Sequence, residues 1–287
     1  MTMRTYTYLW LALTLFMAFE YWALNSHLSL SFANFIKTHG HRFRELNLST
    51  EAGRPISFYL GVVGFGFILM TNPYTWRKKW SILKKIGTLT GWLEFHIFCG
   101  LFGPTCIIFH SGFKVRGLVG ISFWSMIIVA VSGVIGRYIY VQILREEKLT
   151  SQDIKVMDER LEKMRVQAGE KVTVQDLILA KELALHFVGL PDGVEGAKRR
   201  SLVGVLLSSF WGDLRLLFSA PPIVPGLPER SRYLLAANAL NQRRSVLLET
   251  FRRMLGYWHS FHLPFAVFMY LAAVIHIAAA LMFGIGA

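Results

Sequence analysis

Five long apolar runs dominate the pattern of hydrophobic and polar positions along the chain. They occupy residues 6–24, 56–74, 91–113, 118–143 and 257–285. A helix needs roughly 20 apolar residues to cross the hydrocarbon core of a bilayer, so each run is long enough to span it. The intervening segments show no strand-like alternation and no internal repeat. The pattern therefore predicts an all-α integral membrane protein with five transmembrane helices.

Composition agrees with this prediction. Hydrophobic residues make up 53% of the chain and charged residues 17%, whereas soluble domains carry about 25% charged residues. The first run could instead be a secretory signal peptide, because Arg4 precedes it. No small-x-small cleavage site follows that run, so a retained helix is predicted.

Residues 144–256 form a more polar insertion that is predicted to be helical. Apolar residues recur at helical spacing from 154 to 164, and Thr173 with Asp176 resembles a capping box that opens a second helix. Residues 201–219 are apolar, but their Asp213 and Arg215 argue against a membrane span and favour an interfacial amphipathic helix. After four prolines, a last amphipathic helix over about 231–255 leads directly into the fifth run.

Lys and Arg residues set the expected orientation. Residues 75–88 contain five Lys or Arg and no acid, which places this loop on the cytoplasmic side of a bacterial inner membrane. The N-terminus is then inside and the C-terminus outside. The net charge of +13 belongs to these membrane-facing segments, so no nucleic-acid partner is expected. The expected divisions are a first helix with a periplasmic segment (1–55), helices two to four (56–143), a cytoplasmic insertion (144–256) and a fifth helix (257–287).

The nine histidines carry the functional signal. His96 and His110 lie 14 residues apart in the third run, and His262 and His276 lie 14 apart in the fifth. A random distribution would give roughly 0.3 pairs at this separation. His27 and His41 form a third such pair in a polar segment, so coincidence does occur, but only the first two pairs lie inside membrane spans.

Helix geometry puts these histidines at two depths. Fourteen residues turn through about 1400° and rise about 21 Å, so both members of a pair share one helix face. The third and fifth runs cross the membrane in the same direction, which places His96 level with His262 and His110 level with His276. Two facing imidazole pairs can hold two b-type haems, each iron with two axial histidines. Each ligand then needs its other ring nitrogen bonded to a carbonyl, a hydroxyl or water.

Other chemistries explain the histidines less well. Four satisfied polar residues in a bundle, or a proton relay, are the alternatives. Zinc fits poorly because no carboxylate or thiolate accompanies the pairs at ligand spacing. The two cysteines, Cys99 and Cys106, are seven residues apart on one run, too far for a disulfide within a helix. The chain has no Cys-x-x-Cys-His, so c-type haem attachment is excluded.

The paired histidines on parallel helices resemble those of dihaem membrane cytochromes b, such as the cytochrome b of cytochrome bc complexes. They are also similar to the ferric reductase-like transmembrane domain of NADPH oxidases. The segments SGVIGRY at 132–138 and YWHSFHLP at 257–264 resemble bacterial b-type cytochrome subunits. The insertion departs from both families, the Pro-Glu-Trp-Tyr quinol motif is absent, and no nucleotide fingerprint occurs.

The resemblance to cytochromes b implies small residues where a porphyrin edge presses on a helix. Gly120 is expected at the depth of His110, and Gly133 or Gly136 at the depth of His96. Ordinary small-residue helix packing is the alternative.

Haem propionates are anions that need cationic or hydrogen-bonding partners. The candidates are Arg137 on the inner side and Lys114 and Arg116 on the outer side. Snorkelling towards the interface explains Arg137 equally well.

The inner end of the bundle is the expected site of quinone chemistry. Glu94 is an intramembrane carboxylate, and His259 lies one turn before His262; either could transfer protons to or from menaquinone or ubiquinone. Glu94 could instead be a helix-start carboxylate, and His259 could replace His262 as ligand at a poorer spacing. The reverse placement, with quinone at the outer haem, stays open.

These features predict an electron-transfer subunit that conducts electrons between a quinone pool and a partner protein. It would work in a complex with iron–sulfur, flavin or multihaem cytochrome subunits, because it has no motif for those groups itself. The alternatives are a proton-relay transporter, which five spans without inverted repeats fit poorly, and a membrane scaffold without haem.

Overall fold

The computed structural model describes residues 2–26, 30–39, 48–51, 53–113, 115, 117–147, 151–169, 172–190, 196 and 200–283. It is 84% helical, and none of these residues lies in a strand. Five of its helices are long and apolar enough to cross a membrane. The predicted all-α membrane fold with five spans is therefore confirmed. The chain forms two compact units, Met1–Ile135 with Ser260–Ala287, and Gly136–His259.

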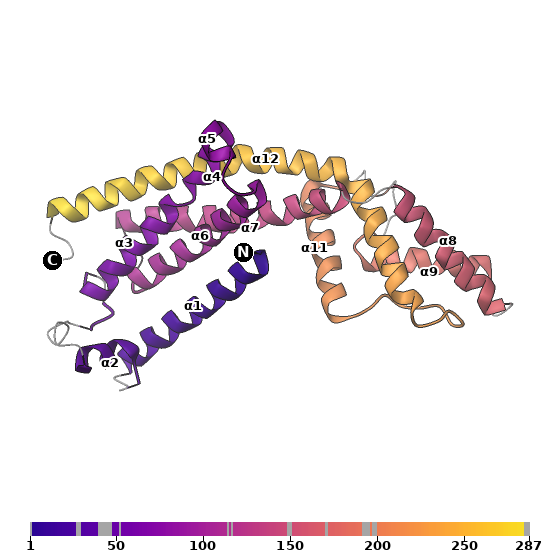
Figure 1. The fold of residues 1–287 in the computed structure, drawn as a ribbon, viewed down its shortest axis with the longest axis horizontal. Coiled ribbons are helices and arrows are strands. Elements are labelled where there is room, and N and C mark those ends of the chain that lie inside the picture. Colours follow the sequence, from indigo (N-terminus) through magenta and orange to yellow (C-terminus); the bar gives the residue numbers. More distant parts are fainter. Residues whose placement is uncertain are drawn as a thin grey trace. The chain divides into compact units, whose positions relative to one another are not determined.

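The first unit holds most of the membrane-spanning helices (Figure 1). In chain order its helices are α1 (Met3–Asn25), α2 (Phe32–His39), α3 (Pro55–Leu69), α4 (Asn72–Lys79), α5 (Ser81–Lys84), α6 (Leu89–His110), the first part of α7 (Gly117–Glu147) and the last part of α12 (Ser231–Phe283). The run from α3 through α4 counts as one candidate span, Pro55–Lys79. The predicted continuity between the last amphipathic helix and the fifth span is confirmed, because α12 is one helix of 53 residues.

Close packing of α3 against α6 forms the centre of the first unit. A Cβ at Gly64 would lie 2.9 Å from the carbonyl oxygen of Gly103, and a Cβ at Gly103 would lie 2.9 Å from that of Gly64. Only glycine at both positions lets the two backbones approach this closely, as is common between membrane helices. Beside this contact, Cys99 and Cys106 are buried and free, in agreement with the expected lack of a disulfide.

Glu20, the only charged residue of the apolar run 6–24, has structural partners. The Glu20 carboxylate on α1 accepts hydrogen bonds from the Ser31 hydroxyl (2.8 Å) and from the backbone N–H groups of Phe32 (2.7 Å) and Ala33 (3.2 Å). These N–H groups begin α2, whose first turn has no intrahelical acceptors for them. Glu20 therefore caps α2 and holds it against the end of α1.

The second unit contains the end of α7, then α8 (Ser151–Ala168), α9 (Val174–Phe187), α11 (Leu202–Phe218) and the first part of α12. The predicted capping box is confirmed, since Thr173 and Asp176 bond reciprocally at the start of α9. The backbone N–H of Thr173 also lowers the pKa of the Asp176 carboxyl. At the other end of α9, Gly189 adopts a φ of +93°, and a Cβ there would collide with the Ser208 carbonyl of α11. A glycine is required at this crossing by both the backbone conformation and the space.

Candidate functional site

All four intramembrane histidines belong to the first unit. His96 and His110 lie on α6, and His262 and His276 lie on α12. Each side chain is partly buried. The site can therefore be described within one unit, starting from the neighbours of each ring.

The His110 ring is fixed against α3. Its Nδ1 lies 2.7 Å from the carbonyl oxygen of Ser57, and the Ser57 hydroxyl donates to the His110 carbonyl at 2.7 Å. A Cβ at Gly61 would lie 2.8 Å from the same ring, so glycine makes room for it. A carbonyl only accepts hydrogen bonds, so Nδ1 must carry the hydrogen. In this tautomer Nε2 holds the lone pair that a metal would use.

The His96 ring has the same arrangement with a different carbonyl. Its Nδ1 lies 2.9 Å from the carbonyl oxygen of Thr71, which stands at the break between α3 and α4. The break arises because Pro73 has no N–H for the Leu69 carbonyl, which instead accepts from the Asn72 side chain at 3.0 Å. The irregular backbone thus supplies an acceptor that orients His96.

Tyr270 on α12 forms hydrogen bonds with residues at this break. Its hydroxyl donates to the Ile68 carbonyl at 2.8 Å and accepts from the Asn72 amide at 2.9 Å. The Thr71 hydroxyl also donates to the Ile68 carbonyl, at 2.7 Å. The segment that orients His96 is therefore tied to the helix that carries His262.

His262 is oriented by a hydroxyl. Its Nδ1 lies 2.7 Å from Oγ of Ser132 on α7, and the same Oγ lies 2.9 Å from the Val129 carbonyl oxygen. The Ser132 hydroxyl has one hydrogen to donate, either to Val129 or to Nδ1, so this contact orients the ring without fixing its tautomer. A Cβ at Gly133 would lie 3.8 Å from Cε1 of this ring, which places Gly133 beside His262.

His276 lies close enough to His110 for the two rings to interact electrostatically. Within the described part of the chain, the His276 ring has no hydrogen-bond partner. The described residues also contain no group of three or more His, Cys, Asp or Glu side chains placed to hold one metal ion. Binding of a haem between these histidines stays a prediction.

Gly120 and Gly136, which were predicted to contact haem, have different surroundings. Gly120 is buried at the edge of an open, mainly apolar surface depression that Trp124, Phe265 and Phe268 also line. The space beside Gly136, in contrast, is filled by the indole of Trp258, so ordinary packing accounts for this glycine. Its contact with a haem stays a prediction.

The expected charged residues are only partly described. Nη1 of Arg137, in the second unit, is buried without a hydrogen-bond partner, and the guanidinium lies 6.0 Å from the Tyr140 ring centre. Lys114 and Arg116 lie outside the described residues. Glu94 is partly buried on α6, and His259 is exposed on α12. Pairing with propionates and proton transfer remain predictions for these residues.

Ser57, Gly61, Thr71 and Ser132 are the site residues that the sequence analysis did not name. The analysis did require an acceptor for the second ring nitrogen of each ligand, and three of the four histidines have one. The sequence does show these residues as polar residues and a glycine inside apolar runs, which could have marked them as candidates. Nothing in the sequence, however, assigns each acceptor to its histidine.

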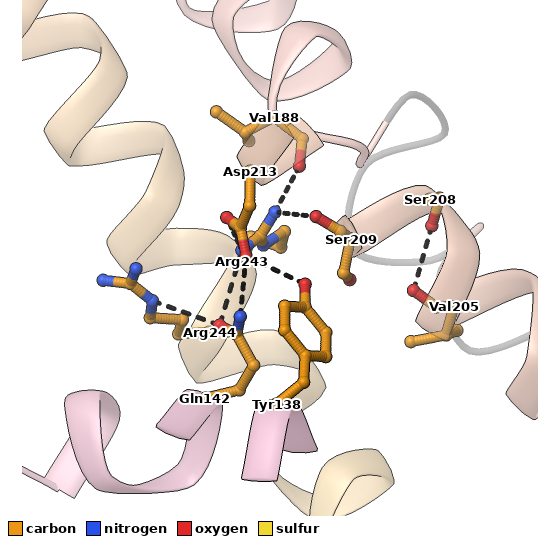
Figure 2. A network of polar contacts seen from close by, with 9 residues as sticks. All are labelled: Tyr138, Gln142, Val188, Val205, Ser208, Ser209, Asp213, Arg243 and Arg244. Atoms are coloured by element: carbon orange, nitrogen blue, oxygen red, sulfur yellow. Dashed lines mark hydrogen bonds and ion pairs between the residues drawn. The ribbon is translucent and has the colours of Figure 1, made fainter. Parts of the chain in front are cut away.

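A second polar cluster lies in the second unit, around the fully buried Arg243 of α12 (Figure 2). Its Nη1 donates to the carbonyl oxygens of Val188 (2.6 Å) and Ser209 (3.1 Å). Its Nη2 forms an ion pair of 2.6 Å with Asp213 on α11. One guanidinium thus joins the end of α9, the middle of α11 and the first part of α12.

Asp213 completes this cluster with two residues of α7. Its second carboxylate oxygen accepts from the Tyr138 hydroxyl at 2.8 Å and from the Gln142 amide at 2.7 Å (Figure 2). The carboxylate is thus satisfied on both oxygens, as a charge in a low-dielectric site requires. The cluster connects α7, α11, α12 and the end of α9 through polar contacts. Nε of Arg243 and the Ser209 hydroxyl are buried in it without a hydrogen-bond partner among the described residues.

Comparison with family models, with curated proteins and with solved structures finds no match to this chain.

Proposed function

We propose that the first unit binds two b-type haems, one between His96 and His262 and one between His110 and His276. The observation that carries the proposal is that Nδ1 is engaged in three of the rings, by the carbonyls of Thr71 and Ser57 and by the hydroxyl of Ser132. A carbonyl partner fixes the tautomer in which Nε2 can ligate a metal, and it increases the basicity of the ligand. A proton relay would need no common tautomer.

Haem iron, when bound, supplies reversible one-electron transfer at a potential set by its ligands and surroundings. Thr71, Ser57 and Ser132 orient three of the imidazoles, and Gly133 leaves space beside His262. The two levels lie about 21 Å apart along each helix, so electrons could cross most of the bilayer. The chain is thus proposed as the electron-transfer subunit of a quinone-linked complex, with a redox partner subunit supplying or accepting electrons.

The visible spectrum and haem content of the purified protein test this proposal. We expect two haems per chain with a low-spin, bis-imidazole spectrum, measured as pyridine haemochrome against protein from haem-replete cells. Dithionite-reduced and oxidised spectra should interconvert reversibly. A haem-to-protein ratio near zero after gentle purification would reject the proposal and favour a scaffold or a proton-relay transporter.

Quinone is the proposed membrane-soluble substrate, reacting near the inner haem. Interconversion of quinone and quinol transfers two electrons and two protons, so the site needs proton-exchanging groups as well as an electron path. Glu94 and His259 are proposed as these groups, because a partly buried carboxylate and an exposed imidazole can both pass protons to water.

Replacing both groups, as Glu94→Gln with His259→Ala, should slow reduction of the haems by a quinol at least tenfold, within the usual range for loss of a general acid–base group. Stopped-flow spectroscopy at the haem absorption bands measures this rate. The control is Glu51→Gln with His39→Ala, which changes one exposed carboxylate and one exposed imidazole that have no proposed role. Unchanged quinol kinetics with both haems intact would reject the inner placement.

A further inference from the structure

Helix α11 exposes its apolar face, whereas an amphipathic helix of a water-soluble protein buries that face. Its inward face consists of Val205, Ser209 and Gly212, all buried. Its outward face exposes six large apolar side chains with 47–84% of their surface accessible: Val203, Leu207, Phe210, Trp211, Leu217 and Phe218. These six form one stripe along the helix, because their spacing follows the helical repeat. An apolar face of this kind is expected to be covered.

The contacts on the inward face fix this orientation. The Ser209 carbonyl and the Asp213 carboxylate are both held by the buried Arg243 guanidinium. A Cβ at Gly212 would collide with the Val188 carbonyl, so no larger residue can take this place. Rotating the apolar stripe inward would leave Arg243 buried without its anionic partner, which is strongly unfavourable.

The same contacts place α11 beside a membrane-spanning segment. Asp213 accepts hydrogen bonds from Tyr138 and Gln142, and both belong to the candidate span Val119–Ile143. The Phe210 ring also lies 5.9 Å from the Tyr138 ring in an edge-on contact. These residues are all in the second unit. Helix α11 therefore lies against the last turns of this candidate span, at the level where the hydrocarbon core of a bilayer would end.

The charges and aromatic residues of α11 favour a lipid surface over a protein partner. Arg215 is exposed on the helix, and three consecutive basic residues, 198–200, precede it in the sequence. Basic residues near a membrane surface are attracted to its anionic headgroups. Trp211 is of the residue type that concentrates at the headgroup level.

We propose that the exposed face of α11 inserts into the headgroup region of the bilayer next to the end of α7, with anionic phospholipid as its occupant. The apolar stripe lies among the upper acyl chains, and Arg215 lies among the phosphates. This inference is independent of haem binding. It gives the second unit a lipid anchor in addition to α7 and α12, the two helices that continue from this unit into the first.

Depth measurement by spin labelling tests the anchor. A nitroxide at Leu207→Cys, in the full chain with Cys99→Ala and Cys106→Ala, should lie roughly 5–10 Å below the headgroup boundary in vesicles containing phosphatidylglycerol. Relative accessibility to oxygen and to an aqueous nickel chelate gives the depth. The matched control is Val174→Cys, because Val174 is 54% exposed on α9 and Leu207 is 52% exposed. The control label should be accessible to the nickel chelate.

A second measurement avoids any effect of the label on folding. Brominated phospholipid should quench tryptophan emission of the native chain more than that of Trp211→Phe. A water-accessible label at Leu207, together with equal quenching of the native and Trp211→Phe proteins, would overturn the proposal and indicate a protein partner for this face.

Discussion

The His276→Ala variant is expected to purify with one haem per chain instead of two, and His110→Ala should lose the same haem. Both residues belong to the proposed outer pair, and loss of one axial ligand leaves a low-spin haem without its second imidazole. His96→Ala and His262→Ala should together define the other haem. Pyridine haemochrome content and low-temperature spectra, which separate two haems by their absorption maxima, measure the result.

His259→Ala is the matched control, because His259 lies one turn before His262 on α12 and is exposed. It should retain both haems. If His259→Ala removed the inner haem and His262→Ala did not, the ligand assignment on α12 would be wrong. If His110→Ala and His276→Ala removed different haems, the pairing by depth would be wrong.

Local patterns were sufficient to predict most of the fold. Each membrane span follows from an uninterrupted apolar run, and helix ends follow from local signals such as the Thr173 capping box. The continuity of α12 also followed, because the amphipathic segment runs into the fifth apolar run without a break. These features depend on neighbours within a few residues, which the sequence displays directly.

The acceptors for the histidine rings could not be assigned in this way. Ser57 and His110 are 53 residues apart, and Ser132 and His262 are 130 apart. Two of the three acceptors are backbone carbonyls, and every residue has one. Only the packing of α3 on α6, and the break at Pro73, select Ser57 and Thr71. The physical requirement could thus be predicted, but not the residues that meet it.

The orientation of α11 was also only partly predictable. Its amphipathic character is visible in the sequence, yet the direction of the apolar face depends on Arg243, which is 30 residues beyond Asp213. An apolar face normally turns towards a protein core. The buried ion pair reverses this preference because it fixes the polar face of α11 on the inside.

Breaking this ion pair is expected to give the largest loss of stability in the second unit. Asp213→Ala should lower its free energy of unfolding by about 3 kcal/mol, near the lower end of the range for an uncompensated buried charge. Arg243 is fully buried whereas the Asp213 side chain is 23% exposed, so water partly compensates. Tyr138 and Gln142 lose their acceptor as well. Urea unfolding of the full chain in mild detergent, followed by hydrogen exchange of α9 and α11, measures the change.

Two further variants separate the stranded charge from a general loss of contacts. Glu162→Ala removes a carboxylate of the same unit that is 47% exposed and pairs with Arg165, and it should cost much less stability because water screens an exposed pair. The double variant Asp213→Ala with Arg243→Met also removes the buried cation, so it should be more stable than Asp213→Ala alone. If the double variant were instead less stable than either single variant, the carbonyl bonds of Arg243 to Val188 and Ser209 would be the main contribution. The ion pair would then be secondary to the role of Arg243 in joining α9 to α11.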